Sequence, residues 1–241
     1  MNIKDVAWVD VKEKLASSNL LIVPLGATET YGPHMAMGTE IYVADYVGNE
    51  LGVRLDCLVT PTIPVTCSGL LDPFPGNLYA YPPVLKAYLK DICDRMVAWG
   101  VERIFFLNVH GPNLGLLDEL SREYMDRKIR CAQVDFWRVM IKLVPDLLHG
   151  PAPHAYGHAS ELAVAVALAI KSDLVFKDRF KTLIPETPFA DKYSDVMMYV
   201  PFNETTPTGH TGDPSKGTSE EGQEALKRTI GRLEQFLRDW K

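Results

Sequence analysis

The chain has 241 residues, of which 46% are hydrophobic and 23% charged, a balance typical of a folded globular protein. Its formal net charge is −6 with acids and bases interspersed, which argues against a surface for nucleic acid or anionic lipid. No apolar stretch reaches the roughly 20 residues of a membrane-spanning helix, and the four cysteines lack CxxC spacing, so we expect a cytoplasmic protein with reduced thiols and one domain over residues 1–241.

The first part of the chain alternates apolar runs with helical patterns. Residues 19–26 form a continuous apolar run ending in glycine, which is typical of a strand buried on both faces of a parallel sheet. Residues 41–51 have apolar positions at helical spacing, and Gly52 is expected to end that helix. A second apolar run at residues 57–63 predicts another strand. Residues 64–83 are rich in proline, glycine and aromatic residues, and such a long ordered loop tends to be functional.

The rest of the chain continues this alternation as far as a loop-rich segment at residues 173–215. Strands are predicted at residues 101–108 and 129–136. Helices are predicted at residues 82–99, 113–126, 159–170 and 219–241. Strands that alternate with helices favour right-handed crossovers, and therefore an α/β fold with a mostly parallel sheet flanked by helices.

Side chains able to bind a metal follow two of the predicted strands. The loop at residues 26–40 carries Glu29 and Glu40, and His110 comes directly after the strand at residues 101–108. Ligands bind beyond the carboxyl ends of the strands in open α/β sheets, so these groups can share one site. Carboxylates with imidazole suit a divalent ion such as Zn²⁺ or Mn²⁺. Because no HExxH spacing is present, the pattern alone leaves open that these are solvated loop residues.

Three segments resemble motifs of the creatininase (creatinine amidohydrolase) family, in the family's order. Residues 26–40 are similar to G-S-x-E-x-H-G-P-H-L-P-x-x-T-D, residues 108–113 to N-G-H-G-G-N, and residues 157–161 to the start of H-A-G-x-x-E-T-S. Shorter similarities to F-P-G-T-I and G-x-x-G-D-P occur at residues 74–78 and 209–214. The resemblance implies a three-layer sandwich with a mostly parallel central sheet between helices.

The resemblance also implies roles for single residues. Glu29 matches the family's first carboxylate ligand, Glu40 stands in the place of its bridging aspartate, and His110 matches the histidine ligand of the first metal. His158 matches the histidine that is thought to pass a proton to the leaving nitrogen, which makes it the expected catalytic residue. The implied cofactor is Zn²⁺ or Mn²⁺, with iron as a third option.

The sequence departs from the family where a second metal would bind. Tyr31 occupies the position of the second-metal histidine, and Pro112 and Ala163 stand where members carry glutamates. A neutral phenol is a poor ligand unless the ion drives its ionisation. His34 and Glu161 are alternative ligands, or contacts to substrate together with Tyr31.

The implied reaction is attack of metal-activated water on the carbonyl of a small cyclic or linear amide. Asn108 and Asn113 are expected to bind this substrate. One alternative is ring opening of a keto-cyclitol of the 3-dehydro-scyllo-inosose type, or of a sugar-derived ring, with one metal. Another is a metal-free protein of the same fold that acts only in binding or assembly.

Two further expectations concern partners and packing. Family members resemble one another in forming closed oligomers, often hexamers, which implies a homo-oligomer acting on a small molecule. Large aromatic side chains mostly fill cores, so Trp8, Trp99 and Trp137 are expected to pack and not to bind substrate.

Overall fold

A four-stranded parallel sheet forms the centre of the computed structural model, which describes residues 1–150, 154–186, 193, 196 and 200–240. The strands are β1 (Leu20–Leu25), β2 (Leu58–Val59), β3 (Arg103–Asn108) and β4 (Arg130–Asp135), in the order β2-β1-β3-β4. Leu25 pairs with Asn108, and Asn108 pairs with Asp135, so the carboxyl ends of these three strands lie at one edge.

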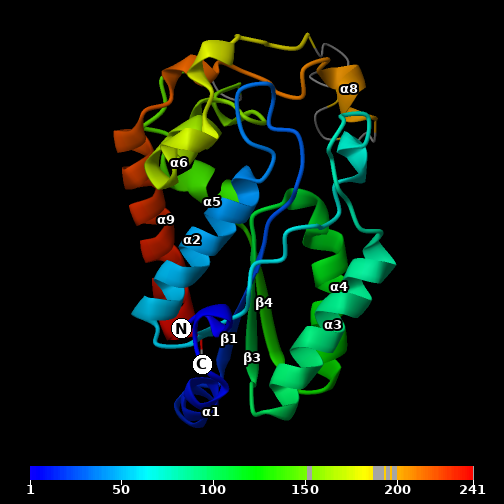
Figure 1. Ribbon diagram of the computed structural model, residues 1–241, viewed down its shortest axis with the longest axis vertical. Coiled ribbons are helices and arrows are strands. Elements are labelled where there is room, and N and C mark those ends of the chain that lie inside the picture. Colours follow the sequence, from blue (N-terminus) through cyan, green and yellow to red (C-terminus); the bar gives the residue numbers. More distant parts are fainter. Residues whose placement is uncertain (151–153, 187–192, 194–195, 197–199, 241) are drawn as a thin grey trace.

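Helices cover both faces of the sheet (Figure 1). One layer consists of α2 (Thr39–Arg54), α5 (Phe136–Leu143), α6 (Glu161–Ile170) and α9 (Ser219–Asp239). The other contains α3 (Pro82–Ala98) and α4 (Leu114–Asp126), and partly buried apolar residues of α1 (Trp8–Ser17) pack against the core on this side of the sheet. The expected three-layer α/β sandwich with a parallel central sheet is confirmed.

The strands are apolar on both faces because each face packs against helices. Along β1, Leu20 and Ile22 belong to the core under α2 and α9, whereas Leu21 and Val23 belong to the core under α3 and α4. Every residue of β1 is buried. Successive side chains of a strand point to opposite faces, so a strand covered on both sides must be apolar throughout.

Short helices connect these elements, mostly beyond the carboxyl edge of the sheet. They are η1 (Ile3–Asp5), η2 (Gly69–Leu71), η3 (Gly111–Asn113), η4 (His154–Tyr156), η5 (Ser172–Leu174), η6 (Lys177–Arg179), α8 (Phe202–Thr205) and η7 (Pro214–Lys216). Parts of the predicted loop at residues 173–215, and Lys241, lie outside the described residues. Within the described part, no helix is long and apolar enough to cross a membrane.

Some local expectations were wrong. The run at residues 57–63 forms only the two-residue strand β2 followed by a bridge at Ile63. The sequence patterns did not predict α1 or α5. Trp8 and Trp99 do not fill a core, because they are 75% and 58% exposed.

Gly52 does not end its helix, because α2 continues to Arg54. A Cβ atom at Gly52 would lie 2.4 Å from Cγ2 of Val59, so the glycine allows α2 to approach β2. We expect Gly52→Ala to lower the free energy of unfolding by about 1–3 kcal/mol through overpacking, as measured by urea denaturation. The matched control is Gly231→Ala in α9, where nothing lies within 4 Å and alanine should stabilise the helix by up to about 1 kcal/mol. If the Gly52→Ala variant were as stable as the parent chain, the expected overpacking against β2 would be contradicted.

Candidate metal centre

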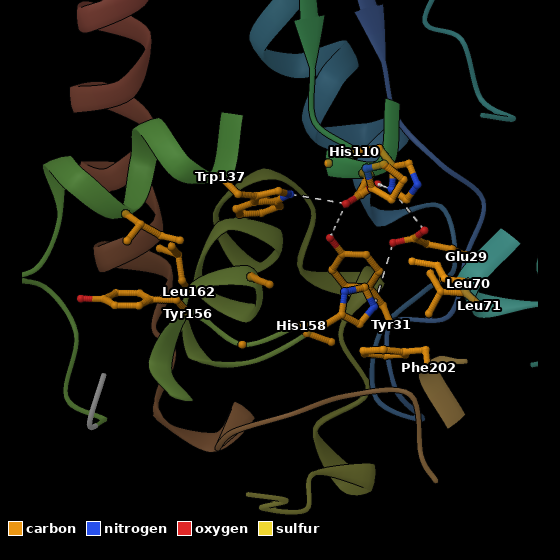
Figure 2. Close-up of a pocket in the computed structure, with 17 residues that line it drawn as sticks. Glu29, Tyr31, Leu70, Leu71, His110, Trp137, Tyr156, His158, Leu162 and Phe202 are labelled. Carbon is orange, nitrogen blue, oxygen red and sulfur yellow. Dashed lines mark hydrogen bonds and ion pairs between the residues drawn. The ribbon is translucent and has the colours of Figure 1, made fainter. Parts of the chain in front are cut away.

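Two carboxylates and one imidazole converge beyond the carboxyl ends of β1 and β3. Nδ1 of His110 lies 2.9 Å from Oε2 of Glu40 and 3.2 Å from Oε2 of Glu29 (Figure 2). One ligand atom from each residue lies within 4.8 Å of the other two, and all three side chains are buried. The structure therefore brings together the three residues for which the sequence predicts metal binding.

The backbone around β1 positions both carboxylates. A Cβ atom at Gly26 would lie 2.6 Å from the backbone nitrogen of Ile41, so only glycine lets the start of α2 come this close to the end of β1. Glu40 thereby stands in the first turn of α2, where the helix dipole favours a negative charge. The amide of Glu29 donates to the carbonyl of Met37 at 3.0 Å and closes the loop between them.

The imidazole of His110 is oriented by the long loop at residues 64–83. Its Nε2 donates to the carbonyl of Cys67 at 3.0 Å, and the hydroxyl of Ser68 lies 3.2 Å from the same nitrogen. A ring nitrogen next to a carbonyl must carry a proton, so in the neutral imidazole the lone pair is on Nδ1 and faces the carboxylates. Metal-binding histidines commonly donate their second nitrogen to a backbone carbonyl in this way.

The charges of this cluster are unbalanced in the absence of a cation. Burial, followed by repulsion from Glu29, raises the pKa of the Glu40 carboxyl above its usual 4.5. Burial by itself would lower the pKa of His110, but Glu40 and Glu29 outweigh it and raise that pKa well above 6.5. Oε2 of Glu29 is buried without a well-aligned hydrogen bond. Burying like charges is costly unless a counter-charge is present.

A divalent ion fits this donor set. Two carboxylates would neutralise its charge, and the neutral imidazole would supply a third ligand through Nδ1, as in three-residue catalytic sites that keep an open position. The unsatisfied Oε2 of Glu29 and the lone pair of His110 both face the position between the three side chains. Glu29, Glu40 and His110 are therefore the residues that could hold the metal.

Tyr31 and Trp137 complete the surroundings of Glu40. The hydroxyl of Tyr31 donates to Oε1 of Glu40 at 2.8 Å, and Nε1 of Trp137 lies 3.4 Å from the same oxygen. Burial, reinforced by the negative charges of Glu40 and Glu29, raises the pKa of the Tyr31 phenol well above 10. Tyr31 is therefore a neutral hydrogen-bond donor in this environment.

His158 lies against the ring of Tyr31 (Figure 2). Its ring centroid is 4.5 Å from that of Tyr31 and 5.2 Å from that of Phe202. Its Nε2 donates to the carbonyl of Thr30 at 2.7 Å and lies 4.0 Å from Oε1 of Glu29. The bond to Thr30 fixes a proton on Nε2, which leaves Nδ1 as the nitrogen able to accept one.

These side chains line a cavity of about 330 Å³ that is largely apolar away from the three candidate ligands. Its apolar wall consists of Leu70, Leu71, Ile141, Leu162 and Phe202. Tyr156 and Leu162 line the cavity on the side away from Glu29 (Figure 2). No lysine or arginine of the described residues lines it.

Four other predicted site residues lie outside the lining of this cavity. The carboxylate of Glu161 accepts the amides of His149 and Gly150 at 2.6 and 2.8 Å, and Nε2 of His34 donates to the carbonyl of Ala159 at 2.8 Å. Asn108 and Asn113 are also buried, and they support the turn that carries His110. Oδ1 of Asn108 accepts from the amide of His110 at 3.3 Å and from Nδ2 of Asn113 at 2.9 Å. In this arrangement all four stabilise loops around the site.

Several residues at the site were not predicted from the sequence. Trp137, expected to be packing, lines the cavity and contacts Glu40, while Ser68 contacts His110 and Phe202 contacts His158. Their positions in the chain match none of the motifs quoted above. The one signal for Ser68 was its place in the long loop that was expected to be functional.

The chain is similar to known proteins over nearly its whole length. The family model described as creatininase, creatinine amidohydrolase, matches residues 4–237. Creatinine amidohydrolase of Pseudomonas putida is 24% identical over 231 residues, covering 88% of each chain. Mycofactocin precursor peptide peptidase of Mycobacterium ulcerans (strain Agy99) is 24% identical over 223 residues, covering 87% of this chain and 81% of that protein. The 3-dehydro-scyllo-inosose hydrolase of Thermotoga maritima is 19% identical over 253 residues, covering 95% of this chain and 80% of that protein.

Solved creatininase structures have the same fold. A mutant creatininase of Zn-Zn type has a TM-score of 0.82 and 21% identity, and covers 99% of this chain and 97% of that one. A manganese creatininase has a TM-score of 0.82 and 20% identity over the same shares. A mutant creatininase complexed with creatine has a TM-score of 0.82 and 21% identity, also over 99% and 97%.

Proposed function

The chain belongs to the creatininase family, and from that premise we propose that it is a metal-dependent hydrolase of a small cyclic or linear amide. The observation that carries the proposal is the buried convergence of Glu29, Glu40 and His110. A divalent ion bound there would activate a water molecule and polarise the carbonyl oxygen of the substrate. Zn²⁺ and Mn²⁺ are the candidate ions, since solved relatives are described with each.

His158 is the residue that would move a proton to the leaving group. Because Nε2 is held by the carbonyl of Thr30, the exchange would take place at Nδ1. The rings of Tyr31 and Phe202 fix the plane of the imidazole, so its orientation is set before substrate binds. We expect His158→Gln to lower kcat/KM by about 10²- to 10⁴-fold, the range of general acid–base catalysis, with metal content unchanged. Loss of metal from this variant would assign His158 a binding role instead.

The apolar wall favours an amide over a polyhydroxylated ring. Each hydroxyl of a cyclitol needs a hydrogen-bond partner when it leaves water, and an unpartnered one costs about 1–3 kcal/mol. The apolar wall, Leu70, Leu71, Ile141, Leu162 and Phe202, supplies no such partner from its side chains. An uncharged amide with an aliphatic or aromatic substituent suits it better. The same wall would also accept the apolar end of a peptide, and one group of relatives is named as precursor peptide peptidases.

The experiment that tests the function begins with elemental analysis of protein purified without chelators. We expect one Zn²⁺ or Mn²⁺ per chain, and chelation should remove hydrolysis of apolar amides, which re-addition of the ion restores. Faster hydrolysis of a keto-cyclitol than of any amide in the panel would favour ring opening. A chain without bound metal, even after Zn²⁺ or Mn²⁺ is added, would contradict the hydrolase and favour a protein that only binds or assembles.

A further inference from the structure

The oxygen of Glu40 that points away from His110 already has two protein donors. Oε2 of Glu40 faces Nδ1 of His110, while Oε1 accepts the hydroxyl of Tyr31 at 2.8 Å and lies 3.4 Å from Nε1 of Trp137. In a two-metal site, a bridging carboxylate gives one oxygen to each ion. Here the second oxygen has neutral hydrogen-bond donors in place of an ion.

We propose that this chain binds a single divalent ion, and that Tyr31 and Trp137 occupy the place of a second one. The inference rests on the proposed function, because it assigns the first ion to Glu29, Glu40 and His110. Tyr31 and Trp137 act as positioning residues: they hold Oε1 of Glu40, so that its Oε2 stays directed at the ion.

The donor chemistry beside Glu40 excludes a second ion. The indole nitrogen of Trp137 is only a donor and has no lone pair for a metal. The phenol of Tyr31 is buried and donates its hydroxyl proton to the carboxylate of Glu40. Among the described residues, the only cluster of three or more histidine, cysteine, aspartate or glutamate side chains with metal-binding geometry is Glu29, Glu40 and His110. A second ion would therefore share Glu40 and find few other ligands.

Charge balance leads to the same result. One divalent ion is neutralised by Glu29 and Glu40, and no further carboxylate lines the cavity among the described residues. A second divalent ion would leave two uncompensated positive charges in a buried site, which is strongly unfavourable. A hydroxyl and an indole N–H provide partial positive charge at Oε1 without adding net charge.

The test is the stoichiometry and affinity of metal binding, measured by titrating chelated protein with Zn²⁺ or Mn²⁺ and by elemental analysis after removal of excess ion. We expect one ion per chain. Tyr31→Phe keeps the ring beside His158 but removes the donor to Glu40, and should weaken the affinity by about 10-fold or more, the usual effect of losing a supporting contact to a ligand. Tyr156→Phe is the matched control. It removes the hydroxyl of another residue that lines the cavity, which points away from Glu29 and His110 (Figure 2), and should leave the affinity unchanged.

A second readout is the ultraviolet difference spectrum on metal addition. Because the hydroxyl of Tyr31 donates to Oε1 of Glu40 and is not proposed to bind an ion, we expect no absorption of ionised tyrosine. Two tightly bound ions in the parent chain, a tyrosinate signal, or unchanged affinity in a folded Tyr31→Phe variant would each overturn this inference and leave the hydrolase proposal intact. A parent chain that binds no ion would instead overturn the proposed function itself.

Discussion

Replacing Glu29 by glutamine is expected to release the metal and to lower kcat/KM for amide hydrolysis by about 10³-fold or more. A catalytic ion contributes several kcal/mol to stabilising the transition state, and each 1.36 kcal/mol corresponds to a factor of ten in rate. The glutamine has nearly the same shape but no negative charge, so only one carboxylate, Glu40, would remain to balance the ion. The measurements are metal content per chain and kcat/KM under the same conditions.

The control for this variant is Glu161→Gln, which also replaces a buried carboxylate near the cavity. Glu161 accepts backbone amides of His149 and Gly150 and lies outside the three-residue cluster. This change should lower the stability of the chain, because charge-assisted hydrogen bonds are weakened, but it should leave the metal in place. Metal loss in Glu161→Gln together with retention in Glu29→Gln would contradict the assignment of the ligands.

The segments that carry the site could be located because they follow strands with strong sequence patterns, whereas the roles of Glu29, Glu40 and His110 were predicted from the resemblance to the creatininase family. The apolar run of β1 and its terminal glycine identified the loop that bears Glu29, and the end of β3 identified the turn that bears His110. Parallel strands bring their carboxyl ends to one edge, so a correct strand assignment was enough to bring these segments together.

The contacts of Trp137 could not be predicted in this way. Asp135 ends β4 and caps α5 by accepting the amide of Arg138, so strand and helix follow one another without the glycine or proline that would mark a boundary. Trp137 approaches Glu40 only because α5 and α2 lie in the same layer. Gly52 illustrates the reverse error: a glycine was read as a helix end, but it serves a close contact with β2.

Removal of the metal is expected to destabilise the protein by about 4 kcal/mol, measured where the free ion in the loaded sample is about 1,000 times its dissociation constant. The effect arises because the ion binds the folded cluster of Glu29, Glu40 and His110, which does not exist in the unfolded chain. Urea denaturation with and without a chelator measures the difference. Glu29→Gln is the control, since the chelator should change its stability little.

The stability that the cluster contributes without metal falls as the pH rises, whereas the stabilisation by bound metal increases with pH. In the metal-free protein the pKa values of His110 and Glu40 are raised above 6.5 and 4.5, so the folded cluster holds protons that the unfolded chain releases. The stability that these protons contribute is fully present at a pH below the pKa values of the unfolded chain. It is lost as the pH rises through the pKa values of the folded chain, by up to about 1.4 kcal/mol per pH unit for each proton. In the loaded protein, protons compete with the ion for the same ligands, so stabilisation by metal increases with pH. Unfolding measured at about pH 6 and about pH 8, with the same concentration of free ion at both, should therefore show a metal effect that is larger at the higher pH. An effect of equal size at both values would mean that the ion does not bind through His110 and the two carboxylates.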